Sequence, residues 1–127
     1  MDIEIDSPVK LSMNFIDFDE HIPSLKASIN LEPLGFKYDL SLSTTLWFEC
    51  EAFDKFLEAL KRKSASTLVD MKRNFELKID FSDRNISWNI SETDLNGGSS
   101  SIKGNRPMSS DELAGLVNSF DSYPKWW

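Results

Sequence analysis

The hydrophobic pattern of this chain changes period within residues 36–60. Apolar residues over 36–48 lie two positions apart, which places them on one face of a β-strand. Over 53–60 the apolar spacing becomes i, i+3, i+4, i+7, which places those residues on one face of a helix. The pattern predicts a long strand from residue 36 that leads directly into an amphipathic helix over 50–63, with no Ser, Thr, Asp or Asn cap at its start.

Other stretches with apolar and polar residues in alternation predict further strands. These strands are expected at 9–15, 25–31, 75–81 and 86–90, with a brief strand at 67–71 and a short edge strand at 99–103 inside a Gly, Ser and Asn-rich loop over 94–107. Charges and Pro23 in IDFDEHIPS, residues 16–24, predict a loop. The S-x-x-E spacing of Ser109 and Glu112 is that of a capping box, and it predicts a second amphipathic helix that ends at Tyr123-Pro124.

Each predicted strand and helix has one apolar face, and this determines the expected fold. Residues 1–127 are predicted to form a single α+β domain in the order βββα(β)ββ(β)α. In this arrangement one antiparallel sheet of five to seven strands carries both helices on one face. The other face is expected to be open to water and to display Trp47, because Leu46 and Phe48 belong to the buried set.

Composition restricts the classes of function. The formal net charge of −7 argues against a sequence-independent nucleic-acid binder, which needs a basic surface, and favours a basic partner. Solubility alone is the other explanation of this charge. The acidic start MDIEIDSPVK lacks a secretory pattern, no stretch has the length of a membrane span, and there is one cysteine; we therefore expect a cytoplasmic protein.

Three features are candidate partner-binding sites. Trp47 is a binding hot spot if it is exposed, or it packs under a loop. The aromatic pair Trp126–Trp127 either docks on a partner or closes the end of the core. Asp17, Asp19 and Glu20 form either an acidic patch for a basic partner or a solvated loop.

Motifs for catalysis or cofactor binding were not found in the sequence. It has no Gly-rich phosphate loop, serine elbow, paired zinc ligands or HExxH motif. Cys50 is interpreted as a small buried residue, because no histidine stands at a family spacing from it. We therefore expect a protein that is not an enzyme and that holds neither a cofactor nor a metal.

Several segments together resemble the WapI-type immunity proteins of bacterial polymorphic toxin systems. They are LSLSTTLWFECEAFDKFLEAL, the segment at Leu68, the strand pair FELKIDF and ISWNI, and the closing helix SSDELAGLVNSFDSYP, and they cover roughly the C-terminal two thirds of the chain. The resemblance implies a binder that neutralises a cognate contact-dependent or secreted toxin domain, such as a basic nuclease. A small-ligand-binding domain, a subunit of a larger assembly and a homo-oligomer remain alternatives.

Overall fold

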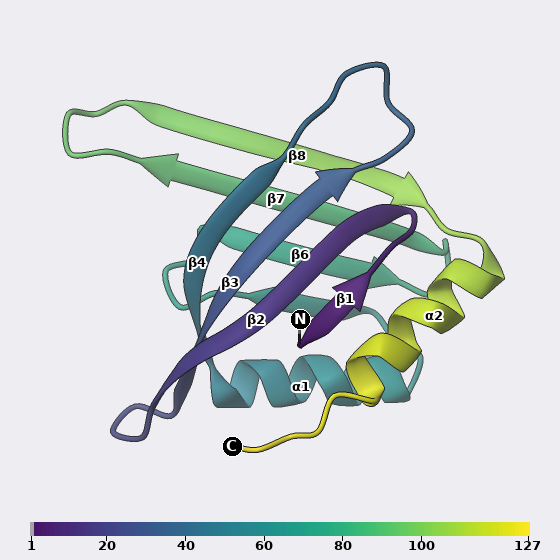
Figure 1. Cartoon of the computed structure of the whole chain (residues 1–127), viewed down its shortest axis with the longest axis horizontal. Coiled ribbons are helices and arrows are strands. Elements are labelled where there is room, and N and C mark those ends of the chain that lie inside the picture. Colours follow the sequence, from purple (N-terminus) through teal and green to yellow (C-terminus); the bar gives the residue numbers. More distant parts are fainter. Residues whose placement is uncertain (1) are drawn as a thin grey trace.

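The computed structural model describes residues 2–127 (Figure 1). In this part of the chain eight strands form two separate four-stranded antiparallel sheets, and two helices accompany them. Sheet A has the strand order β1-β2-β3-β4 and sheet B the order β5-β6-β7-β8. The elements are β1 Ile3–Ile5, β2 Val9–Asp19, β3 Ser24–Pro33, β4 Leu42–Glu49, α1 Cys50–Lys61, β5 Ser66–Val69, β6 Phe75–Asp80, β7 Asn85–Thr93, β8 Ser99–Pro107 and α2 Ser110–Asp121. In the described part of the chain, neither helix has the length and apolar character needed to cross a membrane.

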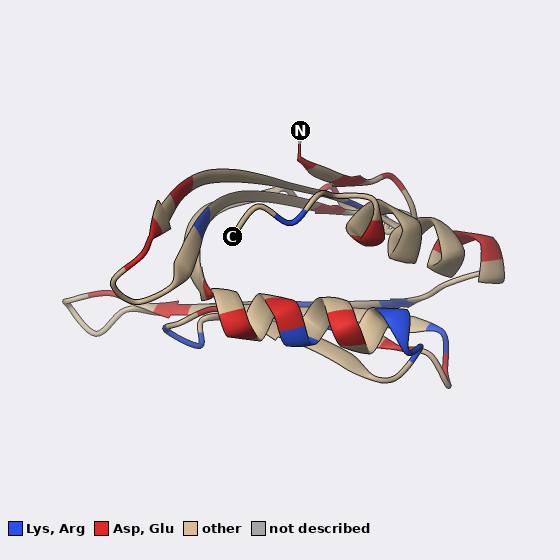
Figure 2. Ribbon diagram, turned by 90° about the horizontal axis from the view of Figure 1, so that it is seen from below, with Lys and Arg blue, Asp and Glu red and all other residues tan. Residues whose placement is uncertain are grey.

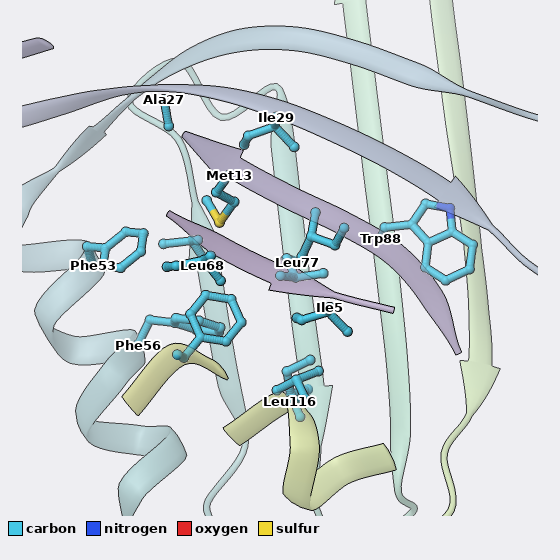
Figure 3. Packing of buried hydrophobic residues seen from close by; sticks show 14 of the residues in the cluster. Ile5, Met13, Ala27, Ile29, Phe53, Phe56, Leu68, Leu77, Trp88 and Leu116 are labelled. Atoms are coloured by element: carbon cyan, nitrogen blue, oxygen red, sulfur yellow. The ribbon is translucent and has the colours of Figure 1, made fainter. Parts of the chain in front are cut away.

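The two sheets lie in two layers, and the hydrophobic core fills the space between them (Figure 2). The helix α1 runs beside β5 and α2 beside β1, so both helices lie along one side of the molecule (Figure 1). Met13 and Ile29 of sheet A, Leu77 of sheet B and Phe53 and Phe56 of α1 all belong to the buried core cluster (Figure 3). Sheet-on-sheet packing, closed on one side by helices, is therefore what buries the apolar faces.

The expectation of a single sheet with two helices on one face is wrong, because the chain forms two four-stranded sheets. Alternation shows that each strand has one apolar face, but it does not show what covers that face. Here β2, β3 and β4 bury their apolar faces against β6 and β7 rather than under a helix layer. The α+β class and the meander of the first three predicted strands agree with the structure, in which β2, β3 and β4 pair antiparallel in sequence.

Several element boundaries also differ from the sequence-based expectation, and one strand was not predicted. The long strand predicted from residue 36 begins only at Leu42, since Phe36 and Tyr38 stack on each other in a loop at 5.7 Å between ring centroids. The loop predicted over 16–24 is mostly strand, because β2 continues to Asp19 through a register shift between Phe15 and Asp17. The short strand β1 was not predicted, and the edge strand β8 runs to Pro107.

Both predicted helices begin as expected. No side chain of the described residues caps α1; instead the backbone N–H of Cys50 donates to the carbonyl of Pro23 at 2.9 Å. In α2 the capping box forms, with Glu112 N–H to Ser109 Oγ at 3.1 Å and Ser109 N–H to Glu112 Oε1 at 2.8 Å. The N–H of Ser109 and the hydroxyl of Ser7 both donate to the Glu112 carboxylate, which lowers the pKa of Glu112 below its usual range. These contacts tie α2 to the N-terminal strands.

A buried carboxylate holds the turn between β5 and β6. Asp70 is 4% exposed, and its Oδ1 accepts the backbone N–H groups of Asn74 at 2.7 Å and Phe75 at 2.9 Å. We expect Asp70→Ala to lower the free energy of unfolding by about 1–2 kcal/mol, because two backbone donors lose their partner. Asp70→Asn is the matched control, since its side-chain oxygen still accepts both bonds. Urea unfolding of the two variants measures the difference, and equal loss in both would contradict this role of the carboxylate oxygen.

Candidate protein-binding surface

The predicted site residues Asp17 and Trp47 lie on the same face of sheet A. Asp17 on β2 is the cross-strand neighbour of Lys26 on β3, and Lys26 is in turn the neighbour of Trp47 on β4. Neighbours in register share a face, and this face is the outer one, since the adjacent row contains buried Leu25 and Phe48. The Nζ atom of Lys26 lies 5.9 Å from the centre of the Trp47 ring, which is a cation–π contact. The Trp47 side chain is half-buried.

Acidic side chains gather where β2 turns into β3. Asp19 is in register with Ser24 and, through it, with Glu49 at the end of β4. Glu20 lies at the turn itself, and the Asp19 Oδ1 atom accepts the backbone N–H of His21 at 2.9 Å. Figure 2 shows acidic residues along this end of the upper sheet. The structure thus places the predicted acids and Trp47 at one end of sheet A.

Large apolar side chains also lie exposed at this end; Trp126 was a candidate from the sequence, whereas Ile16, Phe18 and Ile22 were not predicted. Ile16 is 56% exposed, Ile22 is 60% exposed and Trp126 is 49% exposed. Phe18 is partly exposed and has its ring centroid 5.8 Å from that of Trp126. The signal was present as the apolar positions of IDFDEHI, which were assigned to a loop because of the charges between them.

We call this region the hairpin-end surface. It extends around the end of the β2–β3 hairpin, because Asp17 and Trp47 lie on the outer face of sheet A whereas Phe18 shares the inner row of Leu25. It comprises Ile16, Asp17, Phe18, Asp19, Glu20, Ile22, Trp47, Glu49 and Trp126. It combines exposed apolar side chains with four carboxylates; Lys26 is the cross-strand neighbour of Asp17 and Trp47, and Lys55 and Arg73 line a pocket together with Glu49. Such a combination suits the recognition of a protein surface better than the binding of a small molecule.

Trp127, the last predicted site residue, lies outside the hairpin-end surface and packs against the core. Its ring centroid lies 5.5 Å from that of Phe53 and 5.9 Å from that of Phe15. Its Nε1–H donates to Asp54 Oδ1 at 2.8 Å, and Lys125 Nζ reaches Asp54 Oδ2 at 3.1 Å. Asp54 thus fixes the C-terminal segment to α1, and Trp127 closes the end of the core. The neighbouring Trp126 stays exposed, with its Nε1–H donating to the Tyr123 hydroxyl at 2.7 Å.

The thiol of Cys50 is buried at the start of α1. Burial, reinforced by the nearby Asp54 carboxylate, raises the pKa of Cys50 above its usual value, whereas a reactive cysteine needs the opposite shift. The thiol therefore fits the interpretation of Cys50 as a small buried residue.

A groove of about 490 Å³ lies between α1, α2 and the C-terminal segment. Its floor contains Leu57 and Val117, and two of its acids are already paired, Asp54 with Lys125 at 3.1 Å and Asp121 with Lys61 at 3.5 Å. Within residues 2–127 no three His, Cys, Asp or Glu side chains are grouped to hold a metal ion. Besides apolar contact, the groove thus offers a small ligand the carboxylate of Glu58 and two acids that are already paired with lysines.

Comparison of the chain with models of protein families, with curated proteins and with solved structures gave no match. The surface chemistry of this protein and the resemblance found in its sequence are therefore the evidence for its function.

Proposed function

We propose that this protein is an immunity protein that binds a cognate toxin domain through the hairpin-end surface and neutralises it without catalysis. The observation that carries the proposal is the exposed apolar group of Phe18, Ile22 and Trp126 at the same end of sheet A as the carboxylates of Asp17, Asp19 and Glu20. The WapI-type resemblance of the C-terminal two thirds of the chain supports the same class of function.

The exposed apolar side chains are the energetic part of this proposal. Aromatic residues are enriched at the centres of protein interfaces, where burial of one side chain contributes about 2 kcal/mol or more. Phe18 and Trp126 already contact each other, so a partner that covers them loses little side-chain entropy. Ile16 and Ile22 extend the apolar area around this aromatic pair.

The charge of the surface defines the partner as basic. Asp17, Asp19, Glu20 and Glu49 lie at the same end of sheet A as the apolar group, and the whole chain has a formal charge of −7. Complementary charges accelerate association and align the two proteins before contact. A toxin domain that acts on nucleic acid carries the required basic surface, because phosphate binding demands it.

The first experiment is a pull-down of the product of the gene immediately upstream by this protein, together with a growth test. Cells that produce the upstream product are expected to stop growing and to recover when this protein is also produced. Binding is expected to weaken as the salt concentration rises, because salt screens the carboxylates. Absence of both binding and recovery would contradict the proposal.

We expect the double variant Phe18→Ala/Trp126→Ala to bind the partner about 30-fold more weakly, which corresponds to about 2 kcal/mol. The matched control is Tyr38→Ala, which removes an exposed aromatic side chain at the opposite end of β3. Isothermal titration calorimetry measures both affinities, and circular dichroism confirms that each variant is folded. Equal affinities of the double variant and the control would place the binding surface elsewhere.

A further inference from the structure

The outer edge of β8 pairs with no other strand in the described chain, and near its C-terminal end the loop with Gly35 and Phe36 lies against the Arg106 side chain. In the described chain the other three sheet edges have neighbours: α2 runs beside β1, α1 runs beside β5, and the backbone N–H of Met71 donates to the Trp47 carbonyl on β4 at 2.8 Å. The extensive contacts of β8 are with β7 alone. Figure 1 shows the β7–β8 hairpin projecting beyond the rest of sheet B. An open edge of this kind is a template for another strand.

The usual features that protect an edge strand are sparse over residues 99–105 of β8, whereas Arg106 and Pro107 stand at its C-terminal end. Its register with β7 is regular from Ser99 opposite Thr93 to Pro107 opposite Asn85, without a bulge. Over residues 99–105 it contains no proline and a single charged residue, Lys103. Natural edge strands normally carry bulges, prolines or several charges that prevent pairing.

Hydrogen bonds near the ends of the hairpin show which backbone groups face outward. Asp94 N–H donates to the Gly98 carbonyl at 2.8 Å, and Met108 N–H donates to the Arg84 carbonyl. Hydrogen-bonded pairs alternate along an antiparallel ladder, so the cross-strand pairs of even-numbered residues are the ones bonded between β7 and β8. Consistently, Ser91 N–H donates to Asn74 on the β6 side at 2.8 Å rather than to β8. The N–H and C=O groups of residues 99, 101, 103 and 105 therefore face away from β7.

These outward groups are self-complementary in one antiparallel register. When Ile102 lies opposite Ile102 of a second copy, Ser101 lies opposite Lys103 and Ser99 opposite Asn105, so all outward groups meet outward groups. If the second copy of β8 is shifted by two residues in one direction, the two Lys103 side chains lie opposite each other. If it is shifted by two residues in the other direction, Ile102 lies opposite Ser100. The apolar row Phe75, Ile90, Ile102, which now ends at the sheet edge, continues into the second copy.

The same register brings together exposed side chains at the ends of the strand. Arg106 would lie opposite Gly98 of the second copy, next to the turn that carries the fully exposed Leu95. The Arg106 guanidinium lies 5.1 Å from the Phe36 ring, and Phe36 stacks on exposed Tyr38 in the loop that extends past the β8 edge (Figure 1). The partner's hairpin is acidic near its turn, with Glu92 on β7 and Asp94 just after it, whereas this end of β8 is basic at Arg106.

We propose that the protein associates with a second copy of itself through β8, by antiparallel pairing about a two-fold axis at Ile102. The paired strands form one continuous sheet, and the Phe36–Tyr38 stack of each copy packs against Leu95 of the other. This interface lies on sheet B and is separate from the hairpin-end surface, so it does not depend on the proposed toxin binding.

Light scattering after size exclusion is expected to give twice the 14.5 kDa mass of the chain for the wild type. Ser101→Pro is expected to give the monomer mass, because it removes an outward N–H while leaving the bonds to β7 intact. Ser101→Ala, which loses the hydroxyl but keeps the N–H, is the matched control and is expected to remain dimeric. A monomeric wild type at millimolar concentration, or a dimer of unchanged affinity with Ser101→Pro, would overturn the proposal.

A cysteine test checks the register itself. Ile102→Cys is expected to form an intermolecular disulfide under mild oxidation, since non-hydrogen-bonded antiparallel partners are about 4.5 Å apart between Cα atoms. Lys103→Cys is the control, because its partner in the second copy is Ser101 and not another cysteine. The wild type controls for the buried Cys50. Equal cross-linking of the two variants would contradict the two-fold axis at Ile102, even if the protein is dimeric.

Discussion

Gly104→Val is expected to lower the free energy of unfolding by about 2–4 kcal/mol, because a side chain at this position overlaps the ring of Trp88. Gly104 on β8 lies opposite Trp88 on β7, and the indole covers the glycine backbone. A Cβ atom at residue 104 would lie 2.5 Å from Cζ2 and 2.8 Å from Cε2 of Trp88. Trp88 is 4% exposed within the core, so its ring has little room to move.

Urea unfolding followed by tryptophan fluorescence measures this effect. The matched control is Gly115→Ala in α2, where a Cβ atom meets no other atom within 4 Å in the described structure, and where the gain in helix propensity is expected to raise stability by about 0.5–1 kcal/mol. In a Trp88→Leu background the same Gly104→Val change is expected to cost less, because the overlapping ring is gone. An unchanged cost in that background would show that backbone conformation, and not the indole, requires glycine.

Local features of this fold were predictable from the sequence, because they depend on residues close together in the chain. The capping box of Ser109 and Glu112 satisfies backbone donors within one turn, and it starts α2 as expected. The hairpin of β6 and β7 follows from strict alternation on both sides of a short turn. The passage from β4 to α1 at Cys50 follows from the change in hydrophobic period.

The division into two sheets was not predictable in the same way. One apolar face per strand is compatible with burial under helices and equally with burial against another sheet. Phe36 and Tyr38 continue the apolar alternation of β4, yet they leave the strand and stack near Arg106, which is distant in sequence. Contacts between residues so far apart in the chain are not visible in the apolar alternation.

The candidate site was predictable in its acidic part and not in its apolar part. Asp17, Asp19 and Glu20 stand out in the sequence as a charge cluster. Phe18 lies between them, and its exposure results from its position at the end of sheet A, beyond the core that covers its cross-strand neighbour Leu25. Its contact with Trp126 joins segments more than a hundred residues apart, which periodicity does not reveal.

The adjacent residues Trp126 and Trp127 are expected to differ sharply in their effect on stability. Trp127→Ala removes a ring that packs against Phe15 and Phe53, and it leaves Asp54 without the indole N–H at 2.8 Å. We expect a loss of about 2–3 kcal/mol in the free energy of unfolding, somewhat below the cost for a fully buried tryptophan because Trp127 is half-buried. Thermal and urea unfolding measure this loss.

Trp126→Ala is the matched control, because the same side chain is lost one position earlier from a ring that is 49% exposed. Its effect on stability is expected to stay within about 0.5 kcal/mol, as for most surface substitutions. Trp127→Phe separates packing from hydrogen bonding, since it keeps an aromatic ring against Phe53 but has no donor for Asp54. Similar stability losses in the two alanine variants would mean that Trp127 does not close the core, and it would then return to the candidates for the binding surface.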